Sequence, residues 1–323
     1  MQPILIRDPA SGSSAQILPE LGFNCFDFQA VVGDRTIAVL DASPEFAVGN
    51  ERPSGHGAPI LFPFPNRIRS GRFRWDGVDY RLPEPAVSYD RAGNAIHGFC
   101  LDRPWRVIDR GEQFVVGEFR LSIDAPDRRE FWPADFILTV RYAIRDTTLE
   151  TRVRIQNPDE KPLPWGFGTH PYFRLPLAKE SRSTQCLIEV PAGEEWELID
   201  CLPTGVRRPV PEERDFREGE YYGISSLDDV LTGLSPAEGQ PFVETLIYDE
   251  PAGLQVAQRF DPAFREAVVF TPPDRDAVCI EPYTCVTDAI NLQPRGVDAG
   301  WETLAPGTEA QLWIDIEAGP IWV

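Results

Sequence analysis

The chain has 323 residues and is acidic, with 51 Asp and Glu against 31 Lys and Arg and a net charge of −20. This charge repels phosphate backbones and anionic lipid surfaces, which argues against nucleic acid and membranes as partners. The N-terminus lacks a basic region followed by a long apolar run, and no segment has the apolar length of a membrane-spanning helix. We therefore predict a globular protein of the cytoplasm.

Cysteine, proline and glycine usage narrows the class. Six cysteines are scattered without a C-x-x-C pair, so we expect free, buried thiols instead of a zinc site or a disulfide framework. The three histidines are far apart, and we predict neither a metal nor a cofactor. The 32 prolines and 25 glycines interrupt the chain too often for long helices. Because no repeat or linker divides the chain, we predict one all-β domain spanning residues 1–323.

The first quarter is predicted to contain a strand, a long loop and a hairpin. Apolar residues alternate loosely over residues 21–32, as in a strand. Residues 43–65 are rich in Pro, Gly and Ser and form a predicted loop, in which His56 has mostly polar neighbours and is not expected to act in catalysis. Residues 72–82 form a predicted hairpin, because Asp76-Gly77 tolerates positive φ at both turn positions. The expected cross-strand pairs are Trp75 with Val78, Phe73 with Tyr80, and Arg74 with Asp79.

A notable histidine follows in the segment NAIHGF (94–99). His97 stands directly before Gly98, and a glycine there lets a backbone or a ligand approach closely. A turn histidine without a function is an equally good interpretation of this segment by itself.

Residues 136–157 form a second predicted hairpin, with its turn at Asp146-Thr147. Apolar residues alternate on both sides of the turn. The expected pairs on one face are Ile144 with Leu149 and Val140 with Val153. The other face carries charged residues and is expected to be solvated.

The stretch WGFGTHPYFRLPL (165–177) places His170 between a glycine-rich run and aromatic residues. It predicts a strand that enters a tight, aromatic-walled loop. Histidine is suited to proton transfer because its ordinary pKa lies near physiological pH. The stretch is equally compatible with a structural histidine, so other residues must decide.

The last third is predicted to contain mostly strands. Residues 203–226 are polar and expected to be exposed, and residues 227–230 place two carboxylates in a short apolar frame. The predicted strands are residues 245–248, 253–260, 266–270, 278–281 and 311–317. Glu281 ends the apolar strand AVCIE, where partial desolvation would raise its pKa and make it a better base, although a solvated edge glutamate is the alternative.

Five short motifs, taken together, resemble those of the galactose mutarotase, or aldose 1-epimerase, family in order and approximate spacing. They are NRI (66–68), NAIHG (94–98), THPYF (169–173), LDD (227–229) and CIEPYT (279–284). A hairpin of the form G-x-F-x-x-x-G-x-x-Y lies between the first two, and LAPGTEAQLW (304–313) is similar to the family's final strand entry. The resemblance covers most of the chain. It implies a large antiparallel β-sandwich, often called a supersandwich, with a sugar cleft on one concave sheet face and no cofactor.

The resemblance also implies roles for particular residues. His170 would be the general acid that protonates the ring oxygen, and Glu281 the base that takes the proton from the anomeric hydroxyl. Arg67, His97 and Asp228 would bind and orient sugar hydroxyls, and His97 would also help to polarise the ring oxygen. Asp228 fits the motif better than Asp229. The implied activity is the interconversion of α and β anomers of a free aldose by a monomer or a homodimer.

Two alternatives remain open at this point. One is a non-catalytic carbohydrate-binding protein that retains the cleft, although binding alone needs neither an acid nor a base. The other is an epimerase of a phosphorylated sugar, for which Arg67, Arg69, Arg72 and Arg74 form a basic cluster. Strand alternation spreads these arginines over both faces and pairs Arg74 with Asp79, so we rank the free sugar higher.

Two departures from the family pattern concern the substrate. Arg174 stands where the family often has Asn, and EPYTC (281–285) replaces the residues that many close members carry after their glutamate. Neither change removes the acid or the base. Both leave the identity of the sugar open.

Overall fold

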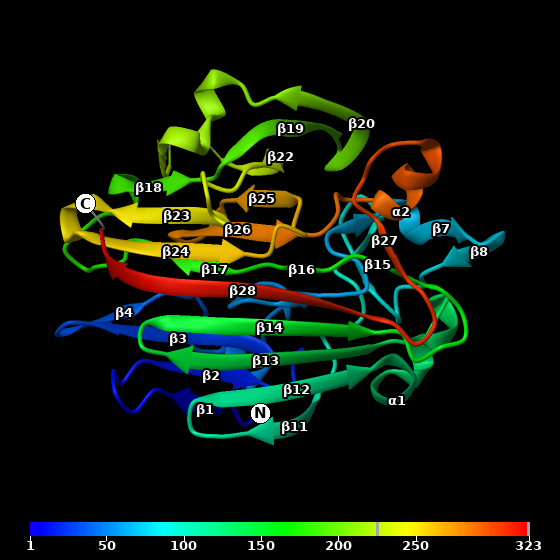
Figure 1. Cartoon of the computed structure of the whole chain (residues 1–323), viewed down its shortest axis with the longest axis horizontal. Coiled ribbons are helices and arrows are strands. Elements are labelled where there is room, and N and C mark those ends of the chain that lie inside the picture. The colour runs from blue at the N-terminus through cyan, green and yellow to red at the C-terminus, as the bar shows by residue number, and fades with distance from the viewer. Residues whose placement is uncertain (224–225, 322–323) are drawn as a thin grey trace.

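The computed structural model describes residues 1–223 and 226–321, and antiparallel strands dominate it (Figure 1). The largest sheet has nine strands, and several of them run side by side through the middle of Figure 1. In spatial order they are β11 (Arg106–Arg110), β12 (Phe114–Arg120), β13 (Ile137–Arg145), β14 (Thr148–Gln156), β28 (Glu309–Pro320), β24 (Leu254–Phe260), β23 (Val243–Asp249), β18 (Cys186–Glu189) and β21 (Glu220–Tyr221).

A second sheet of eight strands carries the candidate site. In spatial order its strands are β20 (Leu202–Pro209), β19 (Ala192–Ile199), β22 (Asp228–Leu234), β25 (Glu266–Phe270), β26 (Ala277–Tyr283), β16 (Gly168–Thr169) and β5 (Ile60–Leu61), and β17 (Tyr172–Arg174) pairs with β26 off this path. Together the sheets form the large antiparallel β-sandwich that the sequence predicts.

Smaller sheets and short helices complete the described part of the chain. One sheet of four strands contains β1 (Ile4–Arg7), β2 (Ser14–Leu18), β3 (Asn24–Val32) and β4 (Arg35–Ala38), and one of three contains β6 (Arg67–Ile68), β10 (Ala95–Ile96) and β9 (Ser88–Tyr89). The two-stranded pairs are β7 (Arg72–Trp75) with β8 (Val78–Arg81) and β15 (Leu163–Trp165) with β27 (Glu302–Leu304). The α-helices are α1 (Leu121–Asp124) and α2 (Ala289–Leu292), and the 3₁₀ turns are Phe46–Val48, Arg69–Gly71, Pro126–Phe131, Ser183–Gln185, Glu212–Arg214, Phe216–Glu218, Glu250–Ala252 and Gln293–Arg295. None of the helices in the described residues has the length and hydrophobicity needed to cross a bilayer.

Both predicted hairpins are confirmed with their registers. In the first, Phe73 lies opposite Tyr80 and Arg74 opposite Asp79, because the Asp-Gly turn fixes the alignment. The rings of Phe73 and Tyr80 stack with centroids 4.9 Å apart. The second hairpin is β13–β14, where the predicted pairs of Ile144 with Leu149 and Val140 with Val153 are also present. The five strands predicted in the last third are all present, some with longer bounds.

The core lies between the sheets. Strands of the large sheet alternate buried and more exposed residues, as in β12 and β14, which is typical of a sheet with one covered face. The strand β26 is buried along its whole length, because one face meets the core and the other lies below the candidate site. All six cysteines are free and five are buried, as predicted, whereas Cys201 is half-buried.

Two segments without a strand pattern in the sequence contain strands. Residues 203–226 were expected to be exposed, and the described ones are exposed or half-buried except Pro203 and Phe216, which are buried; residues 203–209 belong to the edge strand β20. Residues 224–225 of this segment lie outside the described residues. The predicted loop 43–65 contains the buried strand β5. His56 is buried, with its ring 5.2 Å from that of Phe46, and its other partners are polar, as expected: Ser43 N donates to its Nδ1 at 3.2 Å, and Arg275 and Glu51 lie beside it.

Candidate active site

A cavity of about 740 Å³ opens on the eight-stranded sheet, and we call it the main cavity. Its floor comes from β25 and β26, and loops before and after the short strands β6 and β10 form its walls. All five residues that the motifs single out line it: Arg67, His97, His170, Asp228 and Glu281. These residues come from segments that are up to about two hundred positions apart, so only the fold brings them together.

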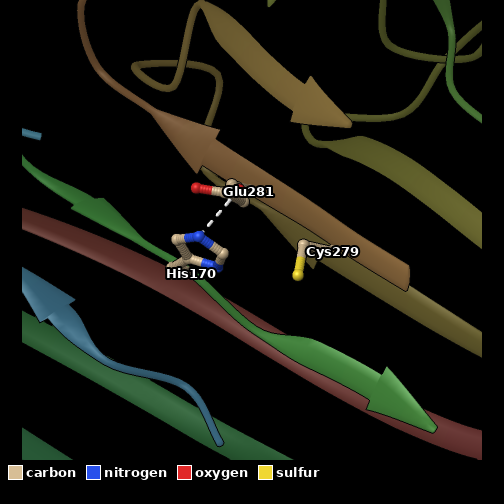
Figure 2. Close-up of side chains that lie close together, drawn as sticks. All are labelled: His170, Cys279 and Glu281. Carbon is tan, nitrogen blue, oxygen red and sulfur yellow. Dashed lines mark ion pairs between the residues drawn. The ribbon is translucent and has the colours of Figure 1, made fainter. Parts of the chain in front are cut away.

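Glu281 and His170 face each other at the bottom of the main cavity (Figure 2). His170 Nε2 lies 3.2 Å from Glu281 Oε1, and both side chains are buried. Glu281 stands near the end of β26, and His170 follows β16, which pairs with β26. The backbone N–H of His170 donates to Pro59 O at 3.1 Å, which fixes the start of the aromatic loop. An acidic and a basic group therefore meet in a site shielded from bulk water.

Burial sets the charge preference of this pair. It raises the pKa of the Glu281 carboxyl well above its ordinary value, and the charge of Asp228 adds to this effect, while the Tyr283 hydrogen bond and Arg67 oppose it. Burial lowers the pKa of His170 to about 3. A desolvated carboxylate is a stronger base, and a desolvated imidazolium is a stronger acid, than either group in water.

Tyr283 is a site residue that the sequence reasoning missed. Its hydroxyl donates a hydrogen bond to Glu281 Oε2, so the two carboxyl oxygens have different partners. Tyr283 lies two positions after Glu281 in β26 and therefore on the same strand face, which is the signal that could have identified it. Gly168 makes room for the ring, because a side chain at that position would overlap it. The glycine-rich run before His170 thus has a steric reason.

His97 lies next to the pair of His170 and Glu281 and also lines the main cavity. Its ring lies edge-on to that of His170, with centroids 5.7 Å apart, and burial lowers its pKa well below its ordinary value. The residue has a φ of 68°, and its N–H donates to Asn66 O at 2.8 Å. Gly98 also has a positive φ, and a side chain there would overlap the backbone of Phe62. The predicted close approach at this glycine is confirmed.

Arg67 is fixed by neighbours of the same wall. Its Nε donates to Asp90 Oδ2 at 2.8 Å and its Nη1 to Asn66 Oδ1 at 2.8 Å. Asp90 also accepts from the backbone and side chain of Asn94. A guanidinium held in this way keeps further N–H groups for a ligand.

The two neighbouring carboxylates of β22 point to different surroundings. Asp228 lines the main cavity, with its Oδ2 3.7 Å from the sulfur of Cys201. Asp229 accepts a hydrogen bond from Arg214, and it lies on the opposite face because side chains alternate along a strand. Of the two candidates in the motif, the geometry gives Asp228 access to a ligand.

The ring of His170 stacks on that of Tyr172, which in turn lies against the guanidinium of Arg275. The rings of His170 and Tyr172 are nearly parallel, with centroids 4.6 Å apart, and the guanidinium of Arg275 lies 4.6 Å from the Tyr172 ring centroid. Arg275 in turn lies 3.2 Å from Asp41. Arg174, which departs from the family pattern, pairs with the same Asp41 at 2.8 Å and does not line the main cavity.

Cys279 completes a group of three side chains whose ligand atoms lie within 4.8 Å of one another (Figure 2). The other two are His170 and Glu281. Burial raises the pKa of the Cys279 thiol well above its ordinary value, and the charge of Glu281 adds to this.

Two further arginines of the main cavity escaped the sequence reasoning. Arg52 and Arg91 both line it, and no ion pair within residues 1–223 and 226–321 includes either. Arg52 lowers the pKa of His170 and of His97, which places its charge near both rings. Both arginines stand in irregular loops without a motif, so no sequence pattern pointed to them.

Comparisons with known proteins identify relatives of this chain. The family model described as aldose 1-epimerase matches residues 32–317. Two uncharacterized proteins of Escherichia coli K12 are similar in sequence: YphB, 26% identical over 80% of this chain and 82% of its own length, and YihR, 23% identical over 75% and 74%. A galactose mutarotase-like protein from Clostridium acetobutylicum has the same fold, with a TM-score of 0.85 and 21% identity over 96% of this chain and 94% of its own. The chain therefore belongs to the aldose 1-epimerase family.

Proposed function

We propose that this protein is an aldose 1-epimerase that interconverts the α and β anomers of a free aldose, with His170 as the acid and Glu281 as the base. The observation that carries the proposal is the contact of 3.2 Å between these two buried side chains at the floor of the main cavity. The ring oxygen and the anomeric hydroxyl of a sugar are attached to the same carbon. An acid and a base that serve them must therefore both lie within hydrogen-bond reach of one O–C–O group, which two neighbouring side chains can do.

The proposed reaction opens and recloses the ring. Glu281 takes the proton from the hydroxyl on C1 while His170 gives a proton to the ring oxygen, so the C1–O5 bond breaks and C1 becomes an aldehyde carbon. Rotation about the C1–C2 bond then presents the other face of the aldehyde. The roles of the two residues reverse, because the oxygen of C5 must lose its proton as it attacks C1 and the C1 oxygen must regain one.

We expect the pair to need no cofactor, because the one proton that His170 and Glu281 share lets one residue act as the acid while the other acts as the base. A carboxylic acid beside a neutral imidazole and a carboxylate beside an imidazolium differ only in where that proton lies between Oε1 and Nε2. Burial favours the neutral form, as the raised pKa of Glu281 and the lowered pKa of His170 indicate. Sugar hydroxyls that replace water around the pair would stabilise the charged form.

The remaining site residues are proposed to hold the sugar. Arg67 and Asp228 would bind hydroxyls with charge-assisted hydrogen bonds, and His97 would donate toward the ring oxygen. Val268 and Phe270 line the same cavity and offer apolar surface to the C–H groups of the ring. The protein is proposed to work on a small sugar as a monomer or a homodimer in the cytoplasm, as one domain.

Polarimetry tests the proposal. Freshly dissolved α-anomers of several aldohexoses and pentoses should reach equilibrium faster with enzyme than in buffer. No acceleration on any of them would refute the proposed activity. Sugar binding in a calorimeter without such acceleration would instead support the non-catalytic carbohydrate-binding protein.

A phosphorylated sugar is the second candidate, and the observation that favours it is that Arg52 and Arg91 line the main cavity without an ion pair among the described residues. The cluster considered from the sequence contributes less, because Arg67 pairs with Asp90 and Arg74 lies 3.5 Å from Asp79. The wall also contains the carboxylates of Asp200 and Asp228, which repel a phosphate. The free sugar therefore ranks first, and a strong preference for glucose 6-phosphate over glucose would reverse this order.

A further inference from the structure

Three side chains on or next to β26 offer the ligand atoms of a metal site (Figure 2). They are an imidazole nitrogen of His170, a carboxylate oxygen of Glu281 and the sulfur of Cys279, and these atoms all lie within 4.8 Å of one another. We infer that the three residues form a binding site for Zn²⁺, and that the ion inhibits the enzyme by occupying its acid and its base. The inhibition rests on the proposed function, whereas the binding of the ion does not.

The separation of His170 Nε2 and Glu281 Oε1 suits a tetrahedral ion. Zinc binds nitrogen and oxygen ligands at about 2.0–2.2 Å, so two such ligands at tetrahedral angles lie about 3.3–3.5 Å apart. The observed distance is 3.2 Å. The same geometry places a thiolate sulfur about 3.6 Å from the other two atoms, so Cys279 needs to approach them by no more than about 1.2 Å.

The sulfur of Cys279 is available as a ligand. Its thiol is fully buried and makes no hydrogen bond with the part of the chain that the structure describes. Cys279 and Glu281 are two positions apart in β26, so both side chains project from the same face of the strand. Imidazole, carboxylate and thiolate are the ligand types that zinc takes in proteins, and a soft thiolate disfavours Mg²⁺ and Ca²⁺.

The buried setting favours an ion that balances the charge of its ligands. Metals bind deprotonated ligands, so Cys279 releases its thiol proton, and the ion replaces the proton that His170 and Glu281 share. Zn²⁺ with one thiolate, one carboxylate and a neutral imidazole has no net charge. Such a complex avoids the cost of placing an uncompensated charge in a site of low dielectric.

An ion reaches the site through the main cavity, which His170 and Glu281 line and which leaves room for a water molecule as the fourth ligand. The cavity walls carry three arginines and three aspartates, so their charges offset one another. These residues are Arg52, Arg67, Arg91, Asp90, Asp200 and Asp228.

Cys201 is the competing thiol, because it is half-buried and lines the main cavity, with its sulfur 3.7 Å from Asp228 Oδ2. Among the described residues, however, only the group with Cys279 brings three ligands together. We therefore expect Cys279 and not Cys201 to hold the ion.

Calorimetry with Zn²⁺ measures the binding, and Cys201→Ser is the matched control for Cys279→Ser. Loss of a group that merely orients a metal ligand costs about 10- to 100-fold in affinity, so loss of the ligand itself should cost at least as much. Cys279→Ser should therefore weaken zinc binding about a hundredfold or more, whereas Cys201→Ser should leave it within about twofold. Cys279→Ala takes the place of Cys279→Ser if circular dichroism shows that the serine variant does not fold.

Co²⁺ and polarimetry give two further measurements. Co²⁺ accepts the same ligands as zinc, and a cobalt–thiolate bond absorbs in the near ultraviolet, so this band should appear in the wild type and in Cys201→Ser but not in the Cys279 variant. In polarimetry with glucose, Zn²⁺ should suppress the acceleration by the wild type and EDTA should restore it, whereas Mg²⁺ should have no effect. Each variant is compared with its own rate without zinc.

The outcomes separate the zinc site from the proposed function. A wild type that binds no Zn²⁺, zinc binding that the Cys279 variant keeps, or a cobalt band that Cys201→Ser abolishes would each overturn the site. Zinc binding at Cys279 without loss of glucose mutarotation would overturn the inhibition. If no sugar is accelerated even without zinc, the proposed activity fails, and calorimetry and the cobalt band still decide whether the zinc site exists.

Discussion

The hydroxyl of Tyr283 is expected to control the basicity of Glu281. Tyr283→Phe keeps the buried ring that Gly168 accommodates and removes only the donor to Glu281 Oε2. This hydrogen bond stabilises the ionised carboxylate and so opposes the rise in pKa that burial causes. Without it, the carboxylate is protonated more readily, and less of the base is available to the sugar.

The size of the effect follows from the kind of bond. A hydrogen bond to a charged group is worth about 1.5–3 kcal/mol, and each 1.4 kcal/mol changes an equilibrium about tenfold. We therefore expect kcat/KM of Tyr283→Phe to fall about ten- to a hundredfold. The acidic limb of its pH profile should move to higher pH, because the carboxylate gains its proton at a higher pH than in the wild type.

The assay is polarimetric kcat/KM for glucose across the range from pH 4 to pH 9. Tyr142→Phe is the control, because Tyr142 is also a buried tyrosine but packs in the core, with its ring 5.5 Å from that of Phe23. That variant should keep the wild-type limb. An acidic limb of Tyr283→Phe at the wild-type position, or lower, would refute the reasoning even if the rate falls, because a purely structural role lowers the rate without moving the limb.

Three further predictions concern Glu281, Asp228 and the buried Glu266. Glu281→Gln should lower kcat about 10²- to 10⁴-fold with little change in KM, and a folded variant within about threefold of wild type would contradict the assignment of the base. Asp228→Asn should raise KM about tenfold with kcat little changed, because Asp228 lines the main cavity. Asp229→Asn should leave KM near wild type, because the carboxylate of Asp229 pairs with Arg214 instead. Equal effects of the two variants in steady-state kinetics would contradict the assignment of Asp228. Burial raises the pKa of Glu266 from 4.5 to about 7, so the folded state holds this proton more tightly than the unfolded state. The stability that this proton contributes is complete below pH 4.5 and is lost as the pH rises through 7. Between pH 4.5 and pH 7.5, the unfolding free energy of the wild type should therefore fall by about 3 kcal/mol relative to that of Glu266→Gln, as measured by urea titrations. A rise over this range would contradict the prediction.

Local patterns were sufficient for the hairpins. The Asp76-Gly77 turn and the alternation of residues 136–157 specify cross-strand pairs, because a turn of fixed length aligns the residues next to it. Local patterns did not indicate the strand formed by residues 203–209. An edge strand with one solvated face needs few apolar residues, so its polar sequence has no clear strand pattern.

The sequence by itself determined the strand-rich class, the two hairpin registers and, through the order of its motifs, the family. Only the tertiary structure decided which face of β22 is functional, and it did so through strand alternation, which separates Asp228 from Asp229. It also brought Arg52 and the Asp200-Cys201 turn, neither of which lies in a motif, to the main cavity, and it showed that Tyr283 contacts Glu281 there. The physical reason is that a site made from loops and strands distant in sequence depends on long-range pairing, whereas hydrophobic patterns and turns report only the nearest neighbours along the chain.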